Sequence, residues 1–133
     1  LFRSHVLVCS LTNARATARY AAQLSETHDL PITFLPTASF ANDITRNEDD
    51  YCADYLEALL TAPETAHEIL ADRIARLHAQ DRFAHWGETK DEDFPGGDLD
   101  LILAVDRCDF AMVGVKKEHE GMVYVDVQAV HAR

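Results

Sequence analysis

A short apolar run followed at once by a helical repeat is the feature that most constrains the fold. Residues 5–9 read HVLVC and end at a polar turn, which favours a strand buried on both faces. Small residues then recur with helical spacing, and residues 31–36 read as a second extended run. A strand, a helix and a strand within about 30 residues predict a βαβ unit with a right-handed crossover. We therefore expect a sheet that is at least partly parallel.

The rest of the chain predicts further helices and a hairpin. A helix is expected from Cys52 to Leu60 behind the acidic Glu48 and Asp49, and another around residues 69–77 with a capping Thr61 or Thr65. A short helix over 99–105 would follow Asp98, and the β-rich runs 110–115 and 122–130 predict a C-terminal β-hairpin. The expected fold is one α/β domain over residues 1–133, a three-layer α/β/α arrangement with a mixed, partly parallel sheet.

Charge and composition exclude several function classes. The formal net charge of -11 argues against nucleic acid as the main partner, because phosphate backbones bind clustered Lys and Arg. No apolar run approaches the roughly 18 residues of a membrane span, and the three cysteines show no CxxC spacing. The seven histidines show no HExxH spacing, which disfavours zinc, and no GxSxG or P-loop motif is present. We expect a cytoplasmic protein with reduced thiols.

The first candidate site lies at the predicted turn between strand and helix. Ser10, Thr12 and Asn13 place hydroxyl and amide groups beside the free N–H groups of a helix N-terminus. Such helix ends favour anions by about 0.3 to 1 kcal/mol at the surface. The alternative is that Thr12 or Asn13 only caps the helix. The chemistry open to this turn is the binding of a small anionic substrate.

The second candidate site is the acidic start of the helix around residue 55. Glu48, Asp49 and Asp50 are consecutive, and Mg²⁺ commonly takes one or two carboxylates together with water and substrate phosphate. Adjacent helical residues diverge by about 100°, so at most two of the three could face one ion. Glu48 and Asp49 flank the preceding polar loop most directly. The alternative is that all three only complement the helix dipole.

Three segments together resemble the 2-phosphosulfolactate phosphatase family. They are residues 94–113, which read FPGGDLDLILAVDRCDFAMV, residues 6–14, which read VLVCSLTNA, and Glu48-Asp49 followed by Cys52-Ala53. The resemblance implies a three-layer α/β fold and Mg²⁺-dependent hydrolysis of the phosphate monoester of a small sulfonated hydroxy acid, a step towards coenzyme M. It spans most of this chain but only the C-terminal half of the family's usual length, so we expect further residues upstream.

Under this hypothesis the candidate residues acquire roles. Glu48 and Asp49 would hold Mg²⁺, while Asn13 and Glu48 would be catalytic. Ser10, Thr12 and Asn13 would bind the substrate, a small phosphorylated organic acid. The residues do not identify a nucleophile.

A second hypothesis is a non-catalytic anion-binding or assembly module. The family's Ala-Gly-Glu turn is replaced here by residues 37–39, which read TAS, and the N-terminal half of the family is absent. Apolar strands with few charges, such as residues 110–115, also invite edge-to-edge pairing. We therefore expect a homo-oligomer.

Overall fold

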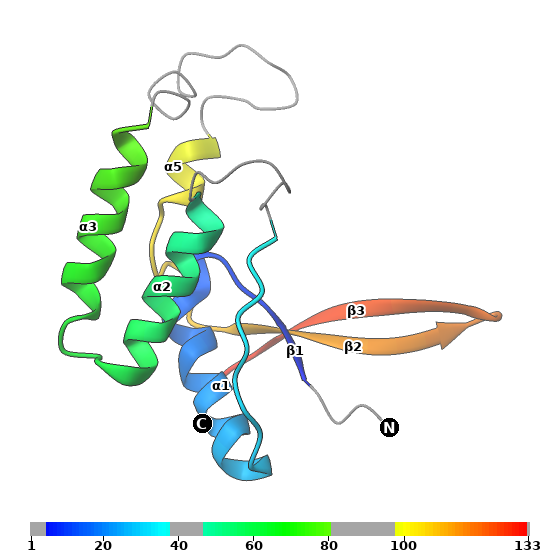
Figure 1. The fold of residues 1–133 in the computed structure, drawn as a ribbon. Coiled ribbons are helices and arrows are strands. Elements are labelled where there is room, and N and C mark those ends of the chain that lie inside the picture. The colour runs from blue at the N-terminus through cyan, green and yellow to red at the C-terminus, as the bar shows by residue number, and fades with distance from the viewer. Residues whose placement is uncertain (1–4, 38–46, 81–97, 133) are drawn as a thin grey trace.

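The computed structural model describes residues 5–37, 47–80 and 98–132, and within them helices gather at one end of a small sheet (Figure 1). The sheet has the order β1-β2-β3, with both pairs antiparallel. Its strands are β1 (Val6–Val8), β2 (Ala111–His119) and β3 (Met122–Val130). The helical elements are η1 (Leu11–Asn13), α1 (Ala14–His28), α2 (Glu48–Thr61), α3 (Ala66–His78) and α5 (Asp98–Ile102).

The expected three-layer α/β/α fold with a mixed, partly parallel sheet is wrong. β1 pairs with β2 in antiparallel register, with Leu7 opposite Val113, and the βαβ unit does not form. Residues 31–36 form no strand among the described residues, and Leu35 is 86% exposed. Prolines stand at both ends of this segment, where each lacks the N–H that a ladder bond would need. The structure instead has an α+β arrangement, with helices at one end of an antiparallel sheet.

Helix α1 confirms the helix predicted after residue 13. Ala14 and Ala18 are buried on its inner face, where small side chains allow a close approach to α2. The helix ends where Asp29 adopts a left-handed conformation, with φ 51°, and donates its N–H to the Ser25 carbonyl.

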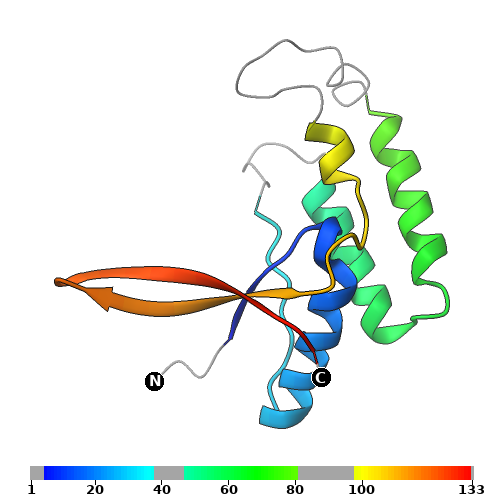
Figure 2. The same ribbon diagram turned by 180° about the vertical axis from the view of Figure 1, so that it is seen from behind.

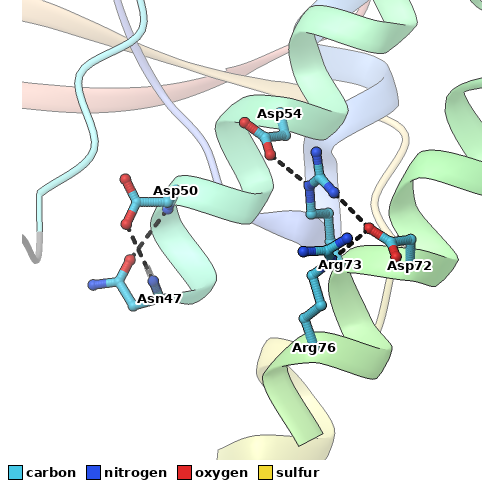
Figure 3. A network of polar contacts seen from close by, with 6 residues as sticks. All are labelled: Asn47, Asp50, Asp54, Asp72, Arg73 and Arg76. Atoms are coloured by element: carbon cyan, nitrogen blue, oxygen red, sulfur yellow. Dashed lines mark hydrogen bonds and ion pairs between the residues drawn. The ribbon is translucent and has the colours of Figure 1, made fainter. Parts of the chain in front are cut away.

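Helices α2 and α3 confirm the next two predicted helices. Tyr55, Leu56 and Leu70 are buried in a core that these helices share with α1. The Arg73 guanidinium of α3 donates to the Asp54 carboxylate of α2 at 2.6 Å (Figure 3). Thr65 stands directly before α3, although its hydroxyl donates to the Ala62 carbonyl and bonds no helical N–H.

The C-terminal hairpin is also confirmed, with a longer first strand than expected. Glu120 and Gly121 form a two-residue turn in which both have positive φ, the geometry of a type I′ hairpin turn. Gly114 lies between β1 and β3, where an added Cβ would come within 3.1 Å of a Val125 methyl carbon. Figures 1 and 2 show the hairpin extending away from the helices.

The short helix predicted over 99–105 is present as α5, which ends at Ile102. Within residues 5–37, 47–80 and 98–132, no helix combines the length and the hydropathy needed to cross a bilayer.

Candidate functional site

The turn after β1 is closed by Asn13. The Ser10 N–H donates to Asn13 Oδ1 at 2.9 Å, and Asn13 Nδ2 donates to the Val8 carbonyl at 3.2 Å. Asn13 is 1% exposed, so its amide is committed to holding the turn. The hydroxyls of Ser10 and Thr12 lie 2.7 Å apart in a hydrogen bond nearer the surface. The three predicted substrate-binding residues therefore lie together. The hydroxyls of Ser10 and Thr12 are nearer the surface, and the buried Asn13 amide holds the turn that carries them.

The N-terminus of α1 already holds a carboxylate. Asp106 Oδ1 accepts the Arg15 N–H at 2.8 Å, which is the interaction that an N-cap side chain makes. The segment carrying Asp106 is held in place because its own N–H donates to the Leu11 carbonyl and the Cys108 N–H donates to the Thr12 carbonyl, both at 2.9 Å. An anion approaching this helix end must therefore meet the charge of Asp106.

Arg15, Tyr55 and Asp106 form a polar cluster. The Tyr55 hydroxyl donates to Asp106 Oδ2 at 2.7 Å, and Arg15 donates to Asp106 Oδ2 at 3.2 Å and to the Tyr55 oxygen at 3.1 Å. Burial, followed by the hydrogen bond to Asp106, raises the pKa of Tyr55 to about 12. The cluster lines a cavity of about 630 Å³ together with His67 of α3. The cluster thereby joins α1, α2 and the segment before β2 by side-chain hydrogen bonds.

Sequence reasoning did not find this cluster, because its members are far apart in the chain and none belongs to a recognisable motif. The one available signal was the position of Asp106 inside residues 94–113, the segment that carries the family resemblance.

The three carboxylates at the start of α2 have different surroundings. Asp50 accepts the Asn47 N–H at 3.1 Å and donates its own N–H to Asn47 Oδ1, which makes a reciprocal cap (Figure 3). Asn47 Oδ1 also accepts the N–H of Asp49. Asp49 Oδ2 accepts the Thr37 hydroxyl at 2.8 Å. Glu48 is half-buried and makes no hydrogen bond or ion pair with the described residues. Glu48 and Asp49 thus remain available, and Asp50 is a capping residue.

This pair fits the donor chemistry of Mg²⁺, which accepts hard oxygen ligands and fills its remaining positions with water. The part of the chain that the structure describes contains no group of three or more His, Cys, Asp or Glu side chains arranged to hold a metal ion. The described chain therefore supplies at most these two carboxylates to such an ion.

A cavity of about 960 Å³ lies between β1, α1, the segment 30–37 and the start of α2. Its lining is mainly apolar, and its polar side chains belong to His5, Cys9, Thr17, Ser25, Thr33, Thr37, Asp49 and Cys52. Of the predicted site residues, Asp49 reaches this cavity, whereas Ser10, Thr12, Asn13 and Glu48 do not line it. Ser10, Thr12 and Asn13 therefore lie together at the turn after β1, whereas Glu48 and Asp49 lie together at the start of α2. Asp49 is the predicted site residue that lines the larger cavity.

Comparison with known proteins gives no match: no family model, no curated protein and no solved structure matches this chain.

Proposed function

We propose that this chain carries part of the site of a Mg²⁺-dependent phosphatase that hydrolyses a small phosphorylated hydroxy acid such as 2-phosphosulfolactate. The observation that supports this most directly is that the three carboxylates at the start of α2 have different bonding partners. Asp50 is used for capping, while Asp49 is oriented by Thr37 at the larger cavity and Glu48 stays unbonded beside it. The cytoplasm is the proposed setting, where such metabolic phosphate esters occur.

The chain's own residues have distinct roles in this mechanism. Bound Mg²⁺ would neutralise charge on the phosphoryl oxygens, and Glu48 and Asp49 would hold it. Thr37 positions Asp49 through its 2.8 Å hydrogen bond. Ser10 and Thr12 offer hydroxyl donors to anionic oxygens, and the buried Asn13 keeps the turn that presents them. Asn13 acts here as a positioning residue, because both ends of its amide are bonded within the turn.

A pair of thermal melts with and without millimolar Mg²⁺ tests the metal site. Mg²⁺ at roughly ten times its Kd should stabilise the wild-type protein by about 1.4 kcal/mol, because it binds the folded state. Glu48→Gln with Asp49→Asn should abolish this gain, whereas Glu57→Gln, on the exposed face of the same helix, should keep it. A wild-type protein that shows no Mg²⁺-dependent shift, or a double variant that keeps the full shift, would sink the assignment. Release of phosphate from 2-phosphosulfolactate is the matching activity assay.

A second candidate function, assembly without catalysis, is favoured by the exposed face of β3. Val123, Val125 and Val127 lie on one face of this strand and are 57%, 63% and 49% exposed. β3 is also an edge of the described sheet, whereas the predicted edge strand at residues 110–115 is wrong, because β2 lies between β1 and β3. We propose that a second copy pairs with this edge in antiparallel register about Val125, which places Val123 opposite Val127 of the other copy and opposes no like charges.

Light scattering at increasing protein concentration tests this pairing. Salt should favour the dimer, because screening weakens the repulsion between two copies that each carry a formal charge of -11. Val125→Lys should give a monomer, whereas Glu118→Lys, on the neighbouring strand, should leave the dimer intact. A strict monomer at high concentration and high salt contradicts the proposal.

A further inference from the structure

Two cysteines from distant parts of the sequence meet at the larger cavity. Cys9 directly follows β1, and Cys52 lies near the start of α2. Both side chains line the cavity and lie close enough to influence each other's ionisation, and the Cys9 thiol donates to the Ser10 carbonyl at 3.4 Å. Cys52 is buried, whereas Cys9 is partly exposed and can be reached by a small molecule. Cys108 is also partly exposed but lines neither described cavity.

A buried hydroxyl points to a reactive form of this thiol pair. Thr17 of α1 lines the same cavity, is 4% exposed, and its Oγ1 has no hydrogen-bond partner in the described structure. A buried polar group left unpaired destabilises the folded state. The group to which Thr17 can donate is the neighbouring Cys9 sulfur. A neutral thiol is a weak acceptor, so the hydroxyl gains a good partner only when Cys9 is a thiolate or an oxidised, anionic sulfur.

The electrostatics assign different roles to the two sulfurs. The interaction with Cys52 lowers the pKa of Cys9. The same interaction, together with burial, raises the pKa of Cys52. Because Cys9 is partly exposed and Cys52 is buried, an incoming reagent meets Cys9 first, so Cys9 is the nucleophile and Cys52 keeps its proton until an adjacent leaving group can take it.

We propose that Cys9, Cys52 and Thr17 form a site that reduces apolar organic hydroperoxides and becomes a Cys9–Cys52 disulfide. The cavity wall is built from apolar side chains, among them Leu7, Leu24, Phe34 and Leu56, and this favours an alkyl substituent over a charged one. This site uses other side chains than the carboxylate pair proposed for Mg²⁺, and Asp49 of that pair borders the same cavity.

The reaction has two balanced steps. The Cys9 thiolate attacks the terminal oxygen of the hydroperoxide, so that an S–O bond forms as the O–O bond breaks, and the alkoxide leaves and takes a proton to become an alcohol. Cys52 then attacks the Cys9 sulfenic acid, so that the S–S bond forms as the S–O bond breaks, and the hydroxide leaves as water with the Cys52 proton. In sum, two thiols are oxidised by two electrons, and the hydroperoxide is reduced to alcohol and water.

Mass spectrometry of the fully reduced chain, treated with one equivalent of cumene hydroperoxide or of hydrogen peroxide, tests the proposal. The intact protein should lose the mass of two hydrogen atoms, and peptide mapping should find Cys9 joined to Cys52 while Cys108 remains a free thiol. Cumene hydroperoxide should react faster than hydrogen peroxide because of the apolar lining. A peptide map in which Cys9 and Cys108 are oxidised at equal rates, or in which no Cys9–Cys52 link forms, would overturn the proposal without any variant.

Three variants sharpen the assignment of roles. Cys52→Ala should accumulate a sulfenic acid at Cys9 that dimedone traps, and Cys9→Ser should react with neither peroxide at this site. Thr17→Val keeps the shape of the side chain but removes the donor, so it should slow Cys9 oxidation severalfold, because the thiolate loses a group that can stabilise its charge. Alkylation of Cys108 by iodoacetamide should keep its wild-type rate in all three variants. A Thr17→Val protein that oxidises at the wild-type rate would show that the hydroxyl does not serve Cys9.

Discussion

The helical part of the molecule and the C-terminal hairpin are held together in different ways. Residues buried in the main core come from η1, α1, α2 and α3, whereas β2 and β3 contribute Ala111 as their one buried hydrophobic residue among those described. The hairpin relies on its ladder, its type I′ turn and the ion pair between Lys117 and Asp126. Burial therefore stabilises the helices, while local pairing shapes a hairpin that leaves apolar side chains in solvent.

The largest effect on the free energy of unfolding is expected from a substitution that leaves a cavity in the helical core. Leu70→Ala should lower the free energy of unfolding by about 2–5 kcal/mol, because Leu70 is 4% exposed and packs among α1 and α2 residues. Urea denaturation followed by circular dichroism measures this change. A loss below about 1 kcal/mol would mean that the helices are not held mainly by burial.

The next largest effect is expected at Asp106, whose carboxylate links the segment before β2 to α1 and α2. Asp106→Asn should cost about 1.5–3 kcal/mol, because three donors on Arg15 and Tyr55 bond this carboxylate. Asn tolerates the left-handed backbone found at this position, φ 51°, so the change isolates the charge. Asp109→Asn, at an exposed carboxylate nearby, is the control and should leave the urea midpoint unchanged.

The same cluster predicts a dependence of stability on alkaline pH. The pKa of Tyr55 is raised to about 12 in the folded protein, against about 10 in the unfolded chain, so the protonated phenol favours folding. Its contribution should be complete below pH 10 and should disappear as the pH rises to about 12. Thermal melts of the wild type and of Tyr55→Phe should therefore converge over this range, and a constant difference between their melting temperatures would refute the assignment.

A smaller effect is expected at the start of α2. Asn47→Ala should destabilise the protein by about 1 kcal/mol, since it leaves the N–H groups of Asp49 and Asp50 without their side-chain acceptor. Asn47→Ser should restore most of the loss, because serine also caps helices well. If alanine and serine behave alike in urea denaturation, the cap contributes little to the stability of the helical part.

The smallest effect is expected in the hairpin. Val125→Thr keeps a β-branched side chain at a position that is 63% exposed, so it should change the free energy of unfolding by no more than about 0.5 kcal/mol in dilute solution. A larger loss that grows with protein concentration would show that another copy covers this face, and would erase the contrast between the two regions.

Local patterns were enough to predict α1, α2, α3 and the hairpin, because helical spacing of apolar residues and a turn between two β-rich runs are short-range signals. The acidic start of α2 was also visible, although the pattern could not show that Asp50 caps the helix while Asp49 bonds Thr37. The prediction of a strand at residues 31–36 was wrong. An extended pattern does not specify a partner strand, and the prolines at both ends of this segment cannot donate the backbone hydrogen bonds that a sheet requires.

The sequence by itself determined where the main helices and the C-terminal hairpin form, where the turn Ser10 to Asn13 lies, and which carboxylates could open a helix. Only the tertiary structure decided that β1 pairs antiparallel with β2, that Asp106 occupies the N-terminus of α1, and that Cys9, Thr17 and Cys52 share one cavity. The physical reason is range. Helix spacing and turn chemistry act over a few residues, whereas pairing of strands and meeting of side chains depend on how distant segments pack.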